Sequence, residues 1–149
     1  MPGRRPILVA VAIALTLLLA ACAPRPFSLK FEPSGAPLTE TAAKQLAAST
    51  GIGALASVAT TDAPALRGKV LEDLRTRGAL GVRAADLLTQ GFPPRTAAVP
   101  VLVRVCNVGD DDSIVVVEAF GDTGGTLTHR RLWVFDRTSG TVTFAASFR

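Results

Sequence analysis

Few side chains in this chain of 149 residues are suited to catalysis. His129 is the only histidine, and Cys22 and Cys106 are the only cysteines. A histidine that acts as a general base needs a nucleophile or a carboxylate arranged around it, and neither a Gly-x-Ser-x-Gly nor a His-Glu-x-x-His sequence is present. One histidine with one further cysteine is also too small a ligand set for zinc. The sequence therefore predicts no catalytic centre, no metal site and no cofactor.

Two other groups of residues have a chemical and a structural interpretation. Asp110, Asp111 and Asp112 offer oxygen ligands of the kind that Ca²⁺ prefers, but the alternating spacing and the distant glutamate of an EF-hand are missing. A solvated hairpin turn is the favoured interpretation. Cys106 lies among valines on a predicted strand, with Arg104 as its one basic neighbour, which favours a buried apolar thiol over a reactive one.

One strand face is the best candidate for binding. Alternate residues of the predicted strand over 126–135 combine an arginine and the only tryptophan of the chain with apolar side chains, a composition enriched at protein interfaces. The alternative is a second small core, covered by the segment before residue 38 or by the Gly-rich stretch before Asp62. Both interpretations stay open for this stripe, which consists of Leu127, His129, Arg131, Trp133 and Phe135.

The composition, with 48% hydrophobic and 19% charged residues, fits one globular domain and excludes a disordered chain. The chain has sixteen basic and twelve acidic residues, but Arg4 and Arg5 lie in the N-terminal segment described below, which is expected to be removed. The remaining balance is fourteen against twelve, since 16 − 2 = 14. So small an excess predicts no nucleic-acid interface.

The chain begins with the three regions of a secretory signal peptide. Arg4 and Arg5 precede an uncharged run from Ile7 to Ala21 that ends in small residues. A helix over 7–22 would span roughly 24 Å, less than the ~30 Å hydrocarbon core of a bilayer. Two prolines, Pro24 and Pro26, follow directly. Residues 1–21 are therefore expected to be a signal peptide rather than a membrane span.

The end of this run, Leu19-Ala20-Ala21-Cys22, resembles the lipobox of bacterial lipoproteins. The resemblance implies diacylglyceryl transfer to the Cys22 thiol, cleavage before Cys22 and acylation of the new amino terminus by a fatty acid such as palmitate. Two or three chains anchor a protein stably where one does not. Since Ala23 is not the aspartate that favours inner-membrane retention, the expected place is the periplasmic side of the outer membrane, or the outer face of the plasma membrane in a cell with one membrane.

Two segments are expected after the signal peptide. Residues 22–37, with four prolines, are predicted to be a lipidated tether, within which alternation of Phe27, Leu29 and Phe31 indicates a short edge strand. Residues 38–149 are predicted to be a single domain. Its helices are expected from Thr39 to Ser49, from Asp62 to Gly78 with Arg67 on the outside, and over 82–90, while 50–61 has no clear period.

From residue 100 the hydrophobic period changes to two. Four strands are expected, over 101–108, 114–120, 126–135 and 141–148, joined by short polar loops that favour an antiparallel β-meander. On the last strand Val142, Phe144, Ala146 and Phe148 are expected to share one face. Helices followed by strands predict an α+β domain, with N-terminal helices packed on one face of a four-stranded antiparallel sheet.

The segment from Leu132 to Val142 resembles the Asp–x–x–Ser–Gly hairpin of small exported domains such as PepSY, and the arrangement is loosely similar to PepSY-like and cystatin-like domains. This likeness concerns the fold alone. The expected function is a non-enzymatic binding or assembly accessory of the cell envelope, which is held on the membrane through Cys22 and contacts an envelope protein through the stripe. The alternative is a carrier of a small ligand in a pocket between helices and sheet.

Overall fold

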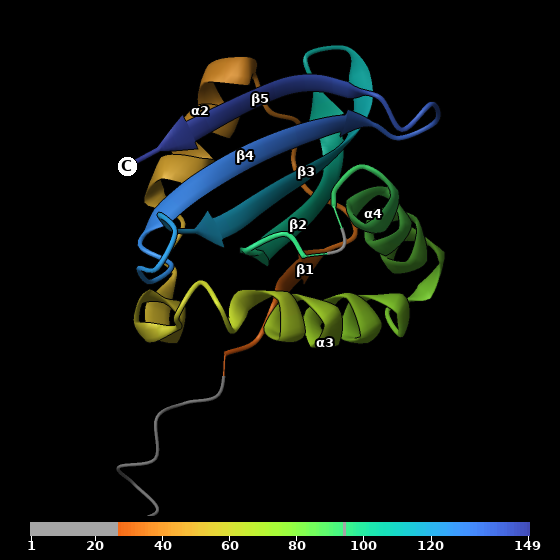
Figure 1. Cartoon of the computed structure of the whole chain (residues 1–149). Coiled ribbons are helices and arrows are strands. Elements are labelled where there is room, and N and C mark those ends of the chain that lie inside the picture. The colour runs from red at the N-terminus through yellow and green to blue at the C-terminus, as the bar shows by residue number, and fades with distance from the viewer. Residues whose placement is uncertain (1–26, 94) are drawn as a thin grey trace, which may run out of the picture.

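The computed structural model describes residues 27–93 and 95–149, and its centre is a five-stranded sheet with the order β1-β2-β3-β4-β5 (Figure 1). The strands are β1 (Lys30–Glu32), β2 (Ala98–Val108), β3 (Asp111–Phe120), β4 (His129–Asp136) and β5 (Val142–Phe148). The predicted signal peptide, Cys22 and the first part of the predicted tether lie outside the described residues. Among those described, no helix combines the length and apolar character needed to cross a membrane.

The predicted α+β class is confirmed, but the four-stranded antiparallel sheet is wrong. A fifth strand, β1, pairs in parallel with β2, so the sheet is mixed. The short edge strand expected near Phe31 is this strand. The following segment also lies along β2, because the Gly35 amide donates to the Val105 carbonyl and the Leu38 amide to the Asn107 carbonyl, both at 2.8 Å. The second half of the predicted tether is therefore packed against the domain.

The helices are α2 (Glu40–Ser49), the short 3₁₀ helix η1 (Gly53–Ser57), α3 (Ala63–Arg75) and α4 (Gly78–Gln90). The expected N-cap of α2 is present, since Thr39 Oγ1 accepts from the Ala42 amide at 3.1 Å. Gly78 was expected to end α3, but it is the first residue of α4. Its φ of +80° lets the chain reverse between the two helices, which makes α4 longer than predicted.

Helices cover both faces of the sheet, so the prediction of helices on one face is wrong. On one face, Lys44 of α2 lies over the Phe144 ring, and Phe144 is opposite Val134 of β4. On the other face, α3 reaches Glu118, which is opposite Arg131. Figure 1 shows α2 behind β4 and β5, whereas α3 and α4 pack together away from it. The sheet thus has a buried core on each side.

Two hairpins follow local turn rules, and each contains a register shift that the sequence did not indicate, at Pro100–Leu102 in β2 and at Val134–Phe135 in β4. Gly109, at φ +62°, lies in the turn between β2 and β3. Between β4 and β5 the register shifts, so that Val134 is opposite Phe144 but Phe135 is opposite Val142. This bulge turns Val142 toward the α4 side with Phe135 and Phe92. The predicted common face of Val142 and Phe144 is therefore wrong.

Candidate functional site

The largest cluster of charged and aromatic side chains surrounds the carboxylate of Glu118, which is completely buried near the C-terminal end of β3. Its Oε1 accepts from Arg67 Nη1 of α3. Its Oε2 accepts from Arg131 Nη2 at 2.9 Å and from Trp133 Nε1 at 2.8 Å, both on β4. Both carboxylate oxygens are thus hydrogen-bonded, and two guanidinium groups compensate the buried charge.

Arg67 links four elements through one side chain. Besides Glu118, its guanidinium donates to the Ala98 carbonyl at the start of β2, at 2.9 Å, and to the Leu88 carbonyl of α4, at 3.0 Å. The side chain is 6% exposed. The prediction that Arg67 lies on the outside of its helix is wrong, because Glu118 supplies the charge partner that makes its burial possible.

Aromatic rings surround the hydrogen-bonded group formed by Glu118, Arg67 and Arg131. Phe92, just after α4, lies with its ring centroid 4.9 Å from that of Trp133 and 6.4 Å from that of Phe135. The Arg131 guanidinium lies 4.9 Å from the Trp133 ring and 5.4 Å from the Phe120 ring. These distances are in the range of cation–π attraction. Arg131 is thereby held on one side by a carboxylate and on the others by rings.

The structure divides the predicted stripe into a buried and a half-exposed part. Leu127 and Phe135 belong to the core, at 0% and 2% exposure. Part of the cover is the Gly-rich stretch, since the Leu127 amide donates to the Val58 carbonyl at 3.1 Å, and the rest is Phe92 with α4. The other three residues of the stripe are half-buried, and they lie against two further half-buried rings, those of Phe92 and Phe120. We call the surface that these five residues form the aromatic–arginine shelf: Phe92, Phe120, His129, Arg131 and Trp133.

The surroundings of His129 are those of a packed ring rather than of a catalytic base. Its ring centroid lies 5.4 Å from that of Phe120, and its Nε2 lies 3.5 Å from Asp122 Oδ2. The Asp122 side chain is 71% exposed and also approaches Arg149. Within the described residues, no serine or cysteine forms a hydrogen bond with His129. The geometry therefore assembles no nucleophile and base around it.

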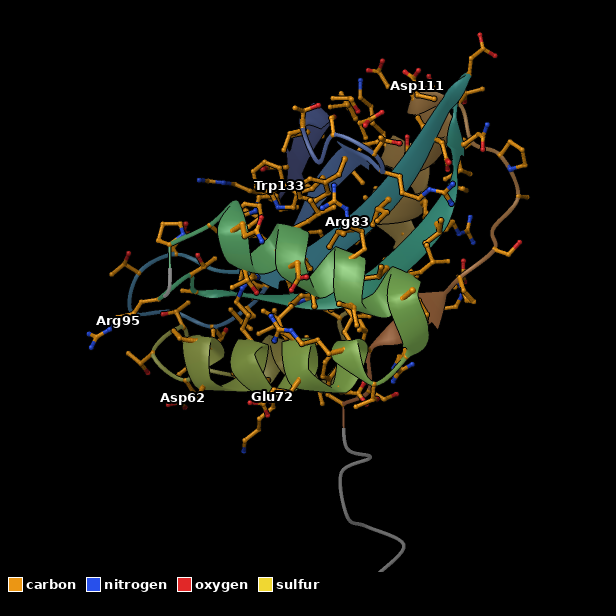
Figure 2. The ribbon with its side chains drawn as sticks, turned by 90° about the vertical axis from the view of Figure 1, so that its right-hand side faces the viewer. Asp62, Glu72, Arg83, Arg95, Asp111 and Trp133 are labelled. Carbon is orange, nitrogen blue, oxygen red and sulfur yellow. The ribbon has the colours of Figure 1, made fainter. Side chains whose placement is uncertain are left out.

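The other sequence candidates lie elsewhere in the fold. Asp111 lies at the far tip of the β2–β3 hairpin, well away from Trp133 (Figure 2). Asp112 forms an ion pair with Arg137. In the described part of the chain, no group of three or more His, Cys, Asp or Glu side chains is placed to hold a metal ion. Cys106 is buried, as expected, and this burial raises the pKa of its thiol.

Sequence reasoning missed Glu118, Arg67 and Phe92, although two signals were present. Arg67 occupies the same helical face as Ala63, Val70 and Leu74, so its position indicated burial while its charge argued against it. Glu118 interrupts an otherwise apolar run on β3. One acid and one base, each at a core position of its own element, are the signature of a buried pair.

A separate groove of about 530 Å³ lies between the C-terminal end of α2, the following turn and the strands β1 and β2. Apolar side chains from Phe27, Leu46, Ile52 and Leu102 line it, together with Lys30. Its volume falls within the roughly 300–1,000 Å³ of small-molecule sites. It is on the α2 side of the sheet and is thus remote from the shelf.

No protein-family model, no curated protein and no solved structure matches this chain. No relative therefore supplies a function for the shelf or the groove.

Proposed function

We propose that the protein is a lipid-anchored, exported lipoprotein that serves as a non-enzymatic binding or assembly accessory of the cell envelope. The anchor rests on the lipobox-like sequence that ends in Cys22. Only four residues separate Cys22 from Phe27, where the described domain begins, so the connection between these two residues reaches at most about 18 Å. The β1 edge of the sheet is then held close to the membrane surface.

The observation that carries the binding role is the aromatic–arginine shelf. Arg131 and Trp133 are fixed in place by Glu118, yet the Arg131 side chain remains 24% exposed. Rigid tryptophan and arginine side chains lose little conformational entropy when a partner covers them, which favours affinity. The shelf is thus suited to an envelope protein that presents an acidic or aromatic side chain to Arg131.

Chemical cross-linking of intact cells, followed by gentle detergent extraction and mass spectrometry, tests this role. We expect one stoichiometric envelope protein with the wild-type chain. His129→Ala and Trp133→Phe should each reduce its yield, whereas Thr128→Ala, at an exposed neighbouring position, should not. Cys22→Ala should release the chain from the membrane fraction. A partner that is retained by both shelf variants overturns the shelf as the contact surface.

A second candidate function is the carriage of a small apolar ligand, and the groove beside Phe27 is the observation that favours it. Its lining would contact an acyl or similar chain, and Lys30 would meet an acidic head group. Organic extraction of the purified chain followed by mass spectrometry should then yield a stoichiometric small molecule. Ile52→Trp, which fills the groove, should abolish its recovery without changing the far-UV circular dichroism.

A further inference from the structure

The two edges of the sheet differ in their protection. The β1 edge has only three residues, carries Lys30 and Glu32, and is followed by Pro33. Short length, charge and proline are the features with which proteins prevent unwanted strand pairing. The opposite edge, β5, has seven residues without a charge or a proline. In the described part of the chain β4 is its only strand neighbour, so the outer backbone groups of β5 are available to another strand.

We propose that a second copy of this chain occupies the β5 edge, by antiparallel pairing of β5 with β5 around a two-fold axis at Ala146. The side chains on the α2 face of β5 make this strand self-complementary. Phe144 and Phe148 flank Ala146 symmetrically, and all three are half-buried. With the axis at Ala146, each Phe144 lies opposite Phe148 of the second copy, and the two Ala146 residues lie opposite each other.

Other registers lose these contacts. A shift of the axis to Ala145 would place Phe148 opposite Val142, which the bulge turns to the other face. A shift of the axis to Ser147 would place Phe148 opposite Ala146 and would give Phe144 no opposite residue within β5 of the second copy. Phe144 and Phe148 are equally distant from Ala146 along the strand, so only an axis at Ala146 places them opposite each other.

In this register the positively charged side chains near β5 stay far from their copies in the second chain. Arg149 would lie opposite Thr143, and the two Arg149 side chains would be six residues apart along the strands, about 20 Å. The two Lys44 side chains lie over the Phe144 rings, which would be four residues apart, about 13 Å. Both separations exceed the Debye length of about 8 Å at physiological salt. Pairing therefore brings no like charges together.

In the dimer, the two aromatic–arginine shelves would lie on the same face of the continuous sheet. Ala145 is opposite Trp133, and Ser147 is opposite Arg131, so all four share the face away from α2. A two-fold axis perpendicular to the sheet leaves each face on its own side. The dimer thus presents two aromatic–arginine shelves in the same direction, while the β1 edges lie at the two outer ends of a continuous sheet.

Oxidative cross-linking of the full chain in membranes tests the register. Ala146→Cys places two thiols on directly opposite residues, whose Cα atoms are about 4.5–5.5 Å apart, within disulfide range. Ala145→Cys is the matched control, because its two copies are offset by two residues and are about 8 Å apart, beyond that range. We expect a covalent homodimer with Ala146→Cys and none above the wild-type background with Ala145→Cys. Equal yields from both variants, no dimer, or a cross-link to another protein overturns the proposal.

A pair of double variants tests the same contact without cysteine. Ala145→Lys with Ser147→Lys places like charges directly opposite each other twice, whereas Ala145→Lys with Ser147→Glu places opposite charges there. Both positions are exposed, so both variants should keep the fold of the single chain. Sedimentation of the detergent-solubilised chain should show a dissociation constant at least about tenfold higher for the double-lysine variant only. Identical values for the two double variants overturn the proposed pairing.

Discussion

The guanidinium of Arg67 and the carboxylate of Glu118 form a buried ion pair between α3 and the C-terminal part of β3, across 51 positions of sequence. The carboxylate side chain is 0% exposed, and Arg131 and Trp133 complete its hydrogen bonds. Because Arg67 also bonds to backbone carbonyls of β2 and α4, this one pair fixes the helical hairpin on the sheet. It also orients the residues of the proposed binding surface.

Removal of the charge at Glu118 should therefore be strongly destabilising. Glu118→Gln leaves two guanidinium groups without their carboxylate, and we expect a loss of about 3–5 kcal/mol in the free energy of unfolding. Urea unfolding followed by tryptophan fluorescence measures it. Glu72→Gln, on the exposed face of α3, is the matched control and should change stability by less than about 0.5 kcal/mol. Similar losses in the two variants would contradict a structural role for the buried pair.

Local signals in the sequence predicted the local structure well. The Thr39 cap, the strand alternation and the turn glycines each depend on a few neighbouring residues, and the structure contains the corresponding helix start, strands and hairpins. The shared face of Arg131, Trp133 and Phe135 also followed from the period of two. Such features are set by backbone geometry and could be read without knowledge of the fold.

What covers each face could not be predicted in the same way. The parallel pairing of β1 with β2 joins residues about seventy positions apart, as in Lys30 with Leu102, and no local pattern specifies it. The covering of Phe135 by Phe92 depends on where α4 ends relative to the sheet. Both features arise from tertiary packing, which also decided that the stripe is partly core.

The turn between β4 and β5 should depend on glycine at position 140. Gly140 has φ +77°, and a Cβ there would lie 2.7 Å from Leu87 Cδ2 of α4. Gly140→Ala should thus lower the free energy of unfolding by about 1–2 kcal/mol. Gly68→Ala, within α3 where a Cβ meets nothing within 4 Å, should raise it by about 0.5–1 kcal/mol. Thermal unfolding of both variants measures these opposite effects, and a stabilised Gly140→Ala would refute the turn geometry.

The edge strand β1 should loosen in acid. Hydrogen bonds from Arg104 and then from Lys30 lower the pKa of Glu32 below its ordinary value of 4.5. Because the folded pKa is the lower one, this contribution to stability is complete above pH 4.5 and is lost as the pH falls through the folded pKa. Hydrogen exchange of the β1 amides, corrected for the intrinsic rate at each pH, should show less protection at pH 3 than at pH 6.

Glu32→Gln isolates this effect from that of Asp136, whose pKa is also lowered, by hydrogen bonds from Ser139. The variant should show the reduced β1 protection already at pH 6, with little further change in acid. Glu40→Gln, on a carboxylate that pairs with Lys44 on the surface of α2, should keep the wild-type pH dependence. An unchanged pH dependence in Glu32→Gln would assign the acid sensitivity to another group.

The number and reactivity of thiols test both the buried position of Cys106 and the proposed lipidation of Cys22. Burial raises the pKa of Cys106 above its ordinary value of 9.0, an effect that Arg104 only partly opposes. The thiolate is the reactive form, so a disulfide reagent at pH 8 should react slowly with the folded chain and rapidly in denaturant. In denaturant, a chain lipidated at Cys22 should then show one reactive thiol per chain, and the lipidated Cys106→Ser variant should show none. Two equivalents from the wild-type chain extracted from membranes would show that Cys22 carries no lipid, whereas fast reaction of the native chain would show that Cys106 is accessible.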